Sequence, residues 1–388
     1  MIIPYGKHKI YKQDINQVVK TLKSNFLTQG PLTTEFENKI SNYCKSKYSV
    51  ASNSATSSLH ISCLALGLKK GHALWTVPNT FVASANCGLY CGASIDFVDI
   101  DKNNLNIDVE KLELKLIKSK KTNTLPKIIV TVHFAGQPTI QEEIYKLSKK
   151  YHFKIIEDAS HSLGSLRNNE RVGNCKYSDI TVFSFHPVKM ITTIEGGIAT
   201  TNSKKIYQLL KLYSSHGIQK DKKQFFNKKN HSNYYEMQKL GLNYRMSDVQ
   251  AALGISQLSK IERFISKRNY LAKLYKKNLS HLPIHFQTIL DNNLSSYHLF
   301  TINFLEKRHI QSKRKIIDQL NKKKINVGVH YIPVHLHPYY AELGFKPNMF
   351  PVAEQHYKST ISLPIFYELK KQQVLYISFI LEKILKKL

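Results

Sequence analysis

The chain has 388 residues, of which 42% are hydrophobic and 22% charged. This length and composition allow a large core and favour more than one domain. Lysine and arginine outnumber aspartate and glutamate by 57 to 27, for a formal net charge of +30, but the basic residues are spread along the whole chain instead of clustering beside aromatic residues. That distribution argues against a nucleic-acid partner, and the charge can instead attract an anionic substrate.

The N-terminus and the cysteines both indicate a cytoplasmic protein. The opening MIIPYGKHKIYK has no uninterrupted apolar core of signal-peptide length, and no run in the chain reaches the roughly 18 apolar residues that a membrane-spanning helix needs. The five cysteines are an odd number, Cys87 and Cys91 do not have a usual zinc-pair spacing, and no second pair follows, so buried free thiols fit better than a disulfide framework or a metal site. We therefore expect neither a membrane partner nor a metal.

The first two thirds of the chain alternate strand-like and helical segments. Short runs of β-branched and aromatic residues predict strands at 48–52, 73–77, 94–100, 127–134, 153–158, 179–185 and 197–201. Helical patterns lie between several of these runs, at 55–67, 108–119 and 140–151. Such alternation predicts an α/β domain with a mostly parallel sheet, whose functional groups gather at the carboxyl ends of the strands.

From about residue 203 the pattern becomes mainly helical. Ser247 has the character of an N-cap for one long amphipathic stretch at 247–279, which could bridge two domains. Near the C-terminus, apolar residues at helical spacing predict an amphipathic helix that closes the last domain: Val374, Leu375, Phe379, Leu381, Leu385 and Leu388. We expect a large α/β domain at 1–255 and a smaller α+β domain at 256–388.

The segment after the strand at 48–52 is a candidate phosphate site. Asn53, Ser54, Ala55 and Thr56 open the next helix. Free N–H groups and hydroxyls therefore face outward, which suits an anion. An ordinary helix cap explains these four residues equally well.

Asp158 ends the buried strand at 153–158. A carboxylate in that setting needs a cationic or hydrogen-bonding partner, which a protonated pyridine nitrogen or a structural salt bridge would supply. His161, three residues later, either contacts the same ligand or caps the turn.

Lys189 lies in SDITVFSFHPVKMITTIEGG, residues 178–197, just past a strand-like run. Pro187 stops the strand because it has no N–H to donate, and Gly196 and Gly197 allow backbone angles and close approaches that other residues resist. The lysine is therefore held on a tight connection that could present a reactive amine. A surface lysine in a lysine-rich chain is the plain alternative.

The residues at these three strand ends together match the groups that pyridoxal phosphate requires. These are a lysine that forms a Schiff base, an aspartate for the pyridinium nitrogen and a phosphate-binding segment. The chain has no GxGxxG after a strand and no GxxxxGK[ST] loop, which argues against a dinucleotide dehydrogenase or an NTPase. His330, His335 and His337 invite a metal interpretation, but they are interleaved with Pro and Tyr without a carboxylate close by.

The same segments carry a resemblance to a known family, and the match covers essentially the whole length. The chain resembles the sugar aminotransferases of the DegT/DnrJ/EryC1/StrS group through FLTQGPLTTEFE, NSATSSLH, WTVPNTFVASANCGLYCGASIDFVDID, VHFAGQP, EDASHSLGS, FSFHPVKMITTIEGG, GLNYRMSDVQAALG and VHYIPVHLHPYY. The resemblance implies the type I fold of pyridoxal-phosphate enzymes, with a mostly parallel seven-stranded sheet in the large domain and a smaller C-terminal α+β domain. VPNTFVASAN, HPVK and SSYHLF are most similar to the branch that makes pseudaminic acid.

The resemblance also implies a role for each candidate residue. Lys189 holds the cofactor covalently, and Asp158 pairs with its pyridine nitrogen. The other implied cofactor contacts are Ala55, Thr56 and Ser184 at the phosphate, Phe81 against the pyridine ring, His161 near the cofactor hydroxyl, and Asn243 at the phosphate of the neighbouring subunit. His330 and Tyr331 fall in the segment that lines the sugar-nucleotide pocket. A site shared between subunits implies a homodimer.

Members of that branch transfer an amino group to C4 of a UDP-linked 4-keto-6-deoxy-N-acetylhexosamine of L-arabino configuration, with L-glutamate expected as donor. A 4-aminotransferase for another nucleotide-linked sugar, UDP-D-xylo or GDP-linked, stays open, as does a catalytically silent binding relative. Met190 stands where the branch usually has proline and Ile194 where it usually has a small residue. Both flank Lys189 and bear on substrate choice more than on reaction class.

Overall fold

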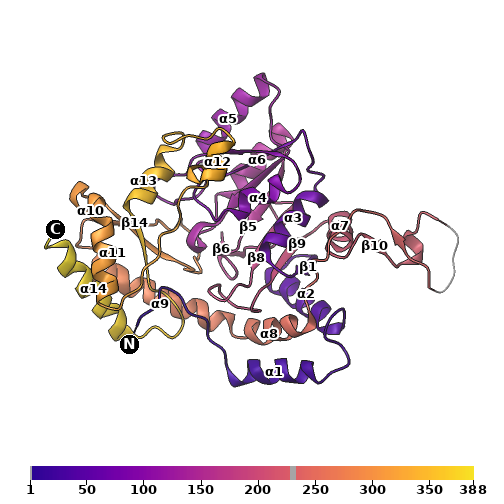
Figure 1. Cartoon of the computed structure of the whole chain (residues 1–388), viewed down its shortest axis with the longest axis horizontal. Helices are drawn as coiled ribbons and strands as arrows, with labels where there is room; N and C mark the ends of the chain where they lie inside the picture. Colours follow the sequence, from indigo (N-terminus) through magenta and orange to yellow (C-terminus); the bar gives the residue numbers. More distant parts are fainter. Residues whose placement is uncertain (1, 228–232) are drawn as a thin grey trace.

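The computed structural model describes residues 2–227 and 233–388. Its largest sheet has seven strands in the order β1-β9-β8-β5-β4-β2-β3 and is mostly parallel, as predicted (Figure 1). Within this sheet, β9 runs antiparallel to both of its neighbours, and the other adjacent pairs are parallel. The strands are β1 (Tyr48–Ser52), β2 (Ala73–Thr76), β3 (Ser94–Phe97), β4 (Ile128–Val132), β5 (Lys154–Asp158), β8 (Ile180–Ser184) and β9 (Gly197–Thr201).

All seven predicted strands are present, and five of them are shorter than predicted. The largest difference is at 94–100, where the strand ends at Phe97. Asp99 accounts for the early end, because its Oδ1 accepts hydrogen bonds from the backbone N–H groups of Ile100 (2.9 Å) and Ala353 (3.0 Å). An aspartate that bonds nearby backbone in this way competes with a continuing strand.

Helices cover both faces of the large sheet. Neighbouring side chains on a strand point to opposite faces. Ile155 of β5 accordingly packs in a core with α5 and α6, whereas Ile156 packs in a separate core with α3 and α7. The helices of this part are α1 (Lys12–Leu22), α2 (Pro31–Cys44), α3 (Ala55–Ala65), α4 (Ala83–Leu89), α5 (Val109–Lys121), α6 (Gln141–Tyr151), α7 (Lys204–Ser214) and α8 (Asp248–Leu258).

The C-terminal part has a sheet and a core of its own. Its antiparallel sheet has the order β12-β13-β14 (Ile284–Phe286, Phe300–Phe304 and Thr360–Leu363). Ile3 from the N-terminus packs into the same core. The helices here are α9 (Ile261–Leu279), α10 (Lys307–Gln311), α11 (Lys313–Lys322), α12 (Pro338–Glu342), α13 (Pro351–Ser359) and α14 (Lys371–Leu385). Short two-stranded pairs complete the fold: β6 (Leu166–Arg167) with β7 (Glu170–Arg171), and β10 (Ile218–Gln219) with β11 (Glu236–Met237).

The expected single helix at 247–279 is wrong, because the chain forms α8 and α9 with a break near Lys260. Ser247 is the N-cap as predicted, since its Oγ accepts the Gln250 N–H at 3.2 Å. The buried Lys260 ammonium bonds Asp14 Oδ1 of α1 at 3.0 Å and so anchors the bend. Beyond the bend, α9 contributes to the core beside the large sheet and to the C-terminal core, so it joins the two.

The C-terminal helix α14 forms where predicted but buries a different stripe. Val374, Leu381 and Leu385 are buried, whereas Leu375 is 38% and Phe379 is 60% exposed. The rest of the inward face is made by Ile377, Ile380 and Ile384. The helix is apolar on more than one side, so spacing alone does not select the face that packs.

Two further features bear on the sequence predictions. In the part of the chain that the structure describes, no helix is both long and apolar enough to cross a membrane. The five cysteines are free thiols, and all except Cys91 are buried. The domain limits 1–255 and 256–388 stay a prediction.

Candidate active site

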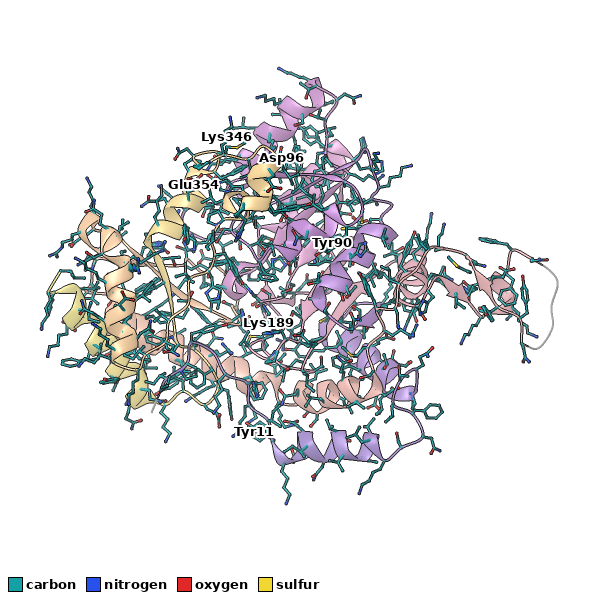
Figure 2. The ribbon with its side chains drawn as sticks, viewed as in Figure 1. Tyr11, Tyr90, Asp96, Lys189, Lys346 and Glu354 are labelled. Atoms are coloured by element: carbon teal, nitrogen blue, oxygen red, sulfur yellow. The ribbon has the colours of Figure 1, made fainter. Side chains whose placement is uncertain are left out.

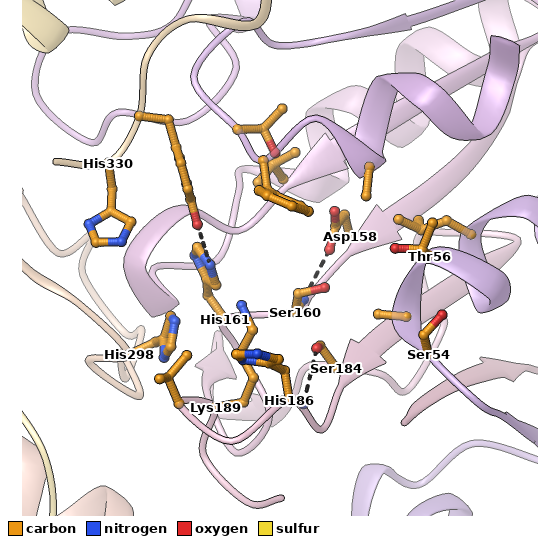
Figure 3. Close-up of a pocket in the computed structure, with 18 of the residues that line it drawn as sticks. Ser54, Thr56, Asp158, Ser160, His161, Ser184, His186, Lys189, His298 and His330 are labelled. Carbon is orange, nitrogen blue, oxygen red and sulfur yellow. Dashed lines mark hydrogen bonds between the residues drawn. The ribbon is translucent and has the colours of Figure 1, made fainter. Parts of the chain in front are cut away.

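A cavity of about 490 Å³ opens at the carboxyl ends of β4, β5 and β8, beside the N-terminus of α3. Every predicted site residue except Asn243 lines it. Figure 2 places Lys189 near the centre of the molecule. Figure 3 shows Ser54 and Thr56 on one side of the cavity and His298 and His330 on the other, with Lys189 between them. The parallel strands thus bring distant segments to one edge of the sheet, as predicted.

The start of α3 forms an anion cradle. Ser54 is its N-cap, with Oγ accepting the Ser57 N–H at 3.1 Å, so Ala55 and Thr56 lie in the first turn. The backbone of Gly197 passes so close that a Cβ there would lie 2.4 Å from Ala55 N. Free N–H groups and the helix dipole in this turn favour a phosphate. Ser184, at the end of β8, lines the same cavity.

Asp158 is held by hydrogen bonds and not by a salt bridge. Its Oδ2 accepts the Ser84 hydroxyl at 2.6 Å, and its Oδ1 accepts the Ser160 N–H at 3.1 Å. Among residues 2–227 and 233–388 it has no ion pair, although it is only 7% exposed. The structural salt bridge that the sequence left open is therefore not its partner, and the carboxylate stays free to meet a cationic ring nitrogen from the cavity.

The neighbouring Glu157 shows what a structural carboxylate looks like in this fold. It points to the opposite face of β5, where it contacts Arg167 and accepts a hydrogen bond from His133 Nε2 at 2.8 Å. Burial alone would raise the pKa of Glu157, but the Arg167 charge and the His133 contact hold it well below its usual range. The paired carboxylate is hidden from the cavity, and the unpaired one, Asp158, faces it.

Lys189 lies on the connection between β8 and β9, where its N–H donates to His186 O at 2.9 Å. In the described chain its ammonium has no ion pair or hydrogen bond. Burial lowers the pKa of Lys189 to about 8, opposed by the negative charge of Asp158. A substantial fraction of the amine is therefore neutral near pH 7.5, which a nucleophile requires.

The structure of the loop around Lys189 gives other reasons for its neighbouring residues than the sequence suggested. Gly196 and Gly197 do not have positive φ, so close approach is the reason for glycine at both positions. Ile194 does have a positive φ, of 70°, and is 60% exposed. A β-branched residue is strained in that region, which gives a physical reason for a small residue there. Met190 is buried in the core beside the large sheet.

Besides the exposed His186, three histidines face the cavity beside Lys189. Burial and then the lysine charge lower the pKa of His330 to about 4. The pKa of His161 lies well below its usual value for the same two reasons. Burial, then His161 and Lys189, lower the pKa of His298. All three imidazoles are therefore neutral at physiological pH, which leaves lone pairs for hydrogen bonding.

Three residues that shape the site were not foreseen from the sequence: Tyr5 and His298 line the cavity, and Ser84 supports Asp158 without lining it. Tyr5 reaches the cavity from the N-terminus, with its ring 5.7 Å from that of His330. Ser84 bonds Asp158 from α4, and His298 stacks near His161 with ring centroids 4.3 Å apart. His298 lies within SSYHLF, a stretch already noted for its similarity, whereas nothing local marks Tyr5 or Ser84.

Asn243 and the other histidines lie elsewhere. Asn243 is exposed and pairs with Ser215 in a β-bridge outside this cavity, so its contact with a neighbouring subunit stays a prediction. His335 is buried against Glu354, with Nε2 and Oε1 3.0 Å apart, and His337 caps α12. Within residues 2–227 and 233–388, no three metal-binding side chains are grouped to hold an ion.

Comparison with known proteins agrees with this geometry. The model of the DegT/DnrJ/EryC1/StrS aminotransferase family matches residues 8–382. A Campylobacter jejuni protein named UDP-4-amino-4,6-dideoxy-N-acetyl-beta-L-altrosamine transaminase is 38% identical over 388 residues, covering 100% of this chain and 98% of the relative.

Solved structures agree in fold. Helicobacter pylori PseC, described as an aminotransferase involved in the biosynthesis of pseudaminic acid, has a TM-score of 0.89 at 32% identity and covers 100% of both chains. The PLP-form of the sugar aminotransferase Spr1654 from Streptococcus pneumoniae has a TM-score of 0.89 at 27% identity, covering 100% of this chain and 99% of that one.

The residues present fit pyridoxal phosphate. The glycine-backed N-terminus of α3 suits its phosphate, the unpaired Asp158 suits its ring nitrogen, and the partnerless amine of Lys189 suits its aldehyde. The cradle, the carboxylate and the amine line one cavity. This chain belongs to the DegT/DnrJ/EryC1/StrS aminotransferase family and is a sugar aminotransferase that depends on pyridoxal phosphate.

Proposed function

We propose that this enzyme transfers the amino group of L-glutamate to C4 of UDP-2-acetamido-2,6-dideoxy-β-L-arabino-hexos-4-ulose. The product is UDP-4-amino-4,6-dideoxy-N-acetyl-β-L-altrosamine, in the synthesis of pseudaminic acid. The observation that carries the proposal is the neutralisable Lys189 amine in a cavity with Asp158. The full-length similarity to the Campylobacter jejuni transaminase supports the choice of sugar.

The first half of the reaction uses glutamate. When bound, pyridoxal phosphate supplies an electron sink and a carbonyl that can be exchanged for an amine. With the cofactor bound, Lys189 Nζ would take the proton from the α-carbon of glutamate, which its lowered pKa of about 8 permits near neutral pH. Asp158, fixed by Ser84 and Ser160, would hold a proton on the pyridine nitrogen. 2-Oxoglutarate leaves, and the amino group stays in the cavity.

The second half runs the same proton movement in reverse. The 4-keto sugar enters beside His330 and Tyr331. Lys189 Nζ returns a proton to C4 of the sugar, and the 4-amino sugar leaves. The net charge of +30 favours the approach of a substrate that carries a diphosphate.

The homodimer and the cytoplasmic location belong to the same proposal. The β10–β11 segment projects from the body of the molecule (Figure 1). Its exposed apolar side chains are Phe226 (81%), Tyr235 (60%), Met237 (62%) and Leu240 (83%). A second copy of the chain would cover them and bring Asn243 to the neighbouring site. Light scattering should give twice the chain mass, and Leu240→Glu should shift it towards the monomer.

A substrate panel tests the reaction. The enzyme is converted to its amino form with glutamate and then offered UDP-4-keto-6-deoxy sugars of L-arabino and D-xylo configuration and a GDP-4-keto sugar. Mass spectrometry follows each amino product. Amination mainly of the L-arabino sugar is expected. Preference for another sugar would keep the mechanism and overturn the pathway, and no turnover of glutamate would indicate a silent binding relative.

A further inference from the structure

The hydrogen bonds of His161 account for both of its ring nitrogens. The Ala135 N–H donates to His161 Nδ1 at 3.2 Å. A backbone N–H is only a donor, so Nδ1 must accept. Because burial and Lys189 keep this imidazole neutral, its single proton lies on Nε2. His161 Nε2 therefore donates to Tyr331 Oη, which lies 3.1 Å away. Figure 3 marks this bond by the dashed line that ends at His161.

This assignment leaves the Tyr331 hydroxyl with a proton to donate. Its oxygen already accepts from His161, and no described residue accepts from it. Tyr331 lines the cavity with Lys189, and burial, followed by the charge of Asp158, raises its pKa. The phenol consequently stays protonated across the working pH range and remains a donor.

The side chain is fixed from several directions. The Tyr331 N–H donates to Asn79 Oδ1 at 3.3 Å, and the ring packs beside Phe81 and Phe134 with centroids 6.5 and 6.3 Å away. His161 is itself held by His298, whose ring centroid lies 4.3 Å away. A hydroxyl held in place in this way can present its proton without a further loss of conformational entropy.

We propose that Tyr331, oriented by His161, donates a hydrogen bond to an oxygen atom in the cavity, either the ring oxygen of pyridoxal phosphate or the carbonyl oxygen of the keto substrate. The resemblance places the side chain of His161 near the cofactor hydroxyl, but neither nitrogen of His161 has a proton left to offer. His161 is then a positioning residue, and Tyr331 is the contact. The substrate half of this proposal rests on the proposed function.

The test compares Tyr331→Phe with a matched control. Tyr340→Phe also removes one buried phenol hydroxyl, which donates to Asn86 Oδ1 at 2.6 Å away from the cavity. His161→Phe removes both hydrogen bonds of the relay and keeps a planar ring against His298. If His161→Phe does not fold, His161→Gln, which retains a donor, takes its place.

The cofactor arm measures the absorbance of the bound cofactor against pH. Loss of the donor leaves more negative charge on the ring oxygen of the cofactor. That charge raises the pKa of the nearby nitrogen atom through which Lys189 is joined to the cofactor. Tyr331→Phe should therefore raise the titration midpoint by about 1 pH unit or more, and Tyr340→Phe should not. This readout needs no sugar, so it remains decisive if the proposed sugar is wrong.

The substrate arm measures each half-reaction by rapid mixing. If Tyr331 bonds the keto oxygen, Tyr331→Phe should lower kcat/KM for the keto sugar about tenfold to hundredfold and leave the glutamate half unchanged. A change in either arm supports the proposal and identifies the acceptor. Tyr331→Phe behaving like Tyr340→Phe in both arms overturns it.

A double variant tests the role of His161. If His161 acts through Tyr331, the pair His161→Phe and Tyr331→Phe should be no worse than the more damaging single change. His161→Gln should recover part of the wild-type titration. Fully additive losses would show that the two residues act separately and would overturn the relay.

Discussion

Opposite sides of the cavity are built from different kinds of chain segment. We call one side the cofactor wall, formed by Ala55, Thr56, Asp158, Ser184 and Lys189. The other is the substrate wall, formed by Tyr5, His298, His330 and Tyr331. The cofactor wall sits at the ends of β5 and β8, at the start of α3 and on the connection from β8 to β9. The substrate wall comes from the N-terminus and the C-terminal part, folded over that sheet.

Because the two walls are held in place differently, substitutions in them should have different effects. Strand ends in one parallel sheet are held by neighbouring strands, so the cofactor groups cannot move independently. Residues of the substrate wall depend on contacts between separate parts of the chain, such as the Tyr331 N–H with Asn79 Oδ1 at 3.3 Å. Changes in the cofactor wall should therefore affect both half-reactions, and changes at His330 in the substrate wall mainly the one that uses sugar.

The largest expected effect is that of Lys189→Ala in the cofactor wall. Turnover should fall below detection, because among residues 2–227 and 233–388 no other lysine lines the cavity to hold the cofactor or move the proton. The fold should persist, since the ammonium has no partner in the described chain. Glutamate consumption and the thermal midpoint measure the two effects, and full activity in the purified variant would refute the mechanism.

Asp158→Asn should lower kcat by about two orders of magnitude or more with little change in stability. The paired control is Glu157→Gln, one residue away on the other face of β5. It leaves Arg167 buried without its carboxylate and should cost about 3–5 kcal/mol of folding free energy. Steady-state kinetics measures the loss of activity in each variant, and chemical denaturation measures the loss of folding free energy. Equal stability losses in both variants would remove the distinction between the two carboxylates.

Gly197→Ala should weaken cofactor binding by about a hundredfold. Its Cβ would lie 2.4 Å from Ala55 N and 2.5 Å from Ala55 Cα, so the start of α3 must shift. Gly6→Ala is the control, because its Cβ would meet only Val188 at 3.7 Å. Titration of the apoenzyme with pyridoxal phosphate measures the affinity, and an unchanged affinity would exclude this cradle.

His330→Leu tests the substrate wall. We expect the KM for the keto sugar to rise about tenfold, because a neutral imidazole that can hydrogen bond is lost from the cavity. Affinity for pyridoxal phosphate should stay within about twofold of the wild type, since His330 lies opposite Thr56 (Figure 3). A loss of cofactor affinity as large as that of Gly197→Ala would break the comparison of the walls.

The smallest expected effect is a shift in pH dependence. Covalent capture of the cofactor needs a neutral amine, so its rate should rise with pH and reach half its maximum near pH 8, not near the 10.5 of an ordinary lysine. The charge of Asp158 raises the Lys189 pKa, so Asp158→Asn should move the midpoint below 8. Stopped-flow absorbance of the apoenzyme measures both, and a midpoint that moves upward would contradict the sign.

The sequence predicted much of the fold and of the cofactor wall because the signals for both lie within short segments of the chain. Strands such as Ile128–Val132 and Gly197–Thr201 are short and rich in β-branched residues, so local chemistry marks them. The single helix expected at 247–279 was wrong, because the break in it depends on the contact of Lys260 with Asp14, which is far away in the chain. The inward face of α14 was missed similarly, because the partner surface selects among several apolar sides.

The sequence by itself determined the strand-helix alternation and the three groups that the cofactor requires, since each depends on residues within one short segment. Only the tertiary structure decided which groups are free to act. It paired Glu157 and left Asp158 open, buried the Lys189 amine, and brought Tyr5 and His298 to the cavity. Those outcomes depend on burial and on contacts between distant segments, which no local pattern of residues contains.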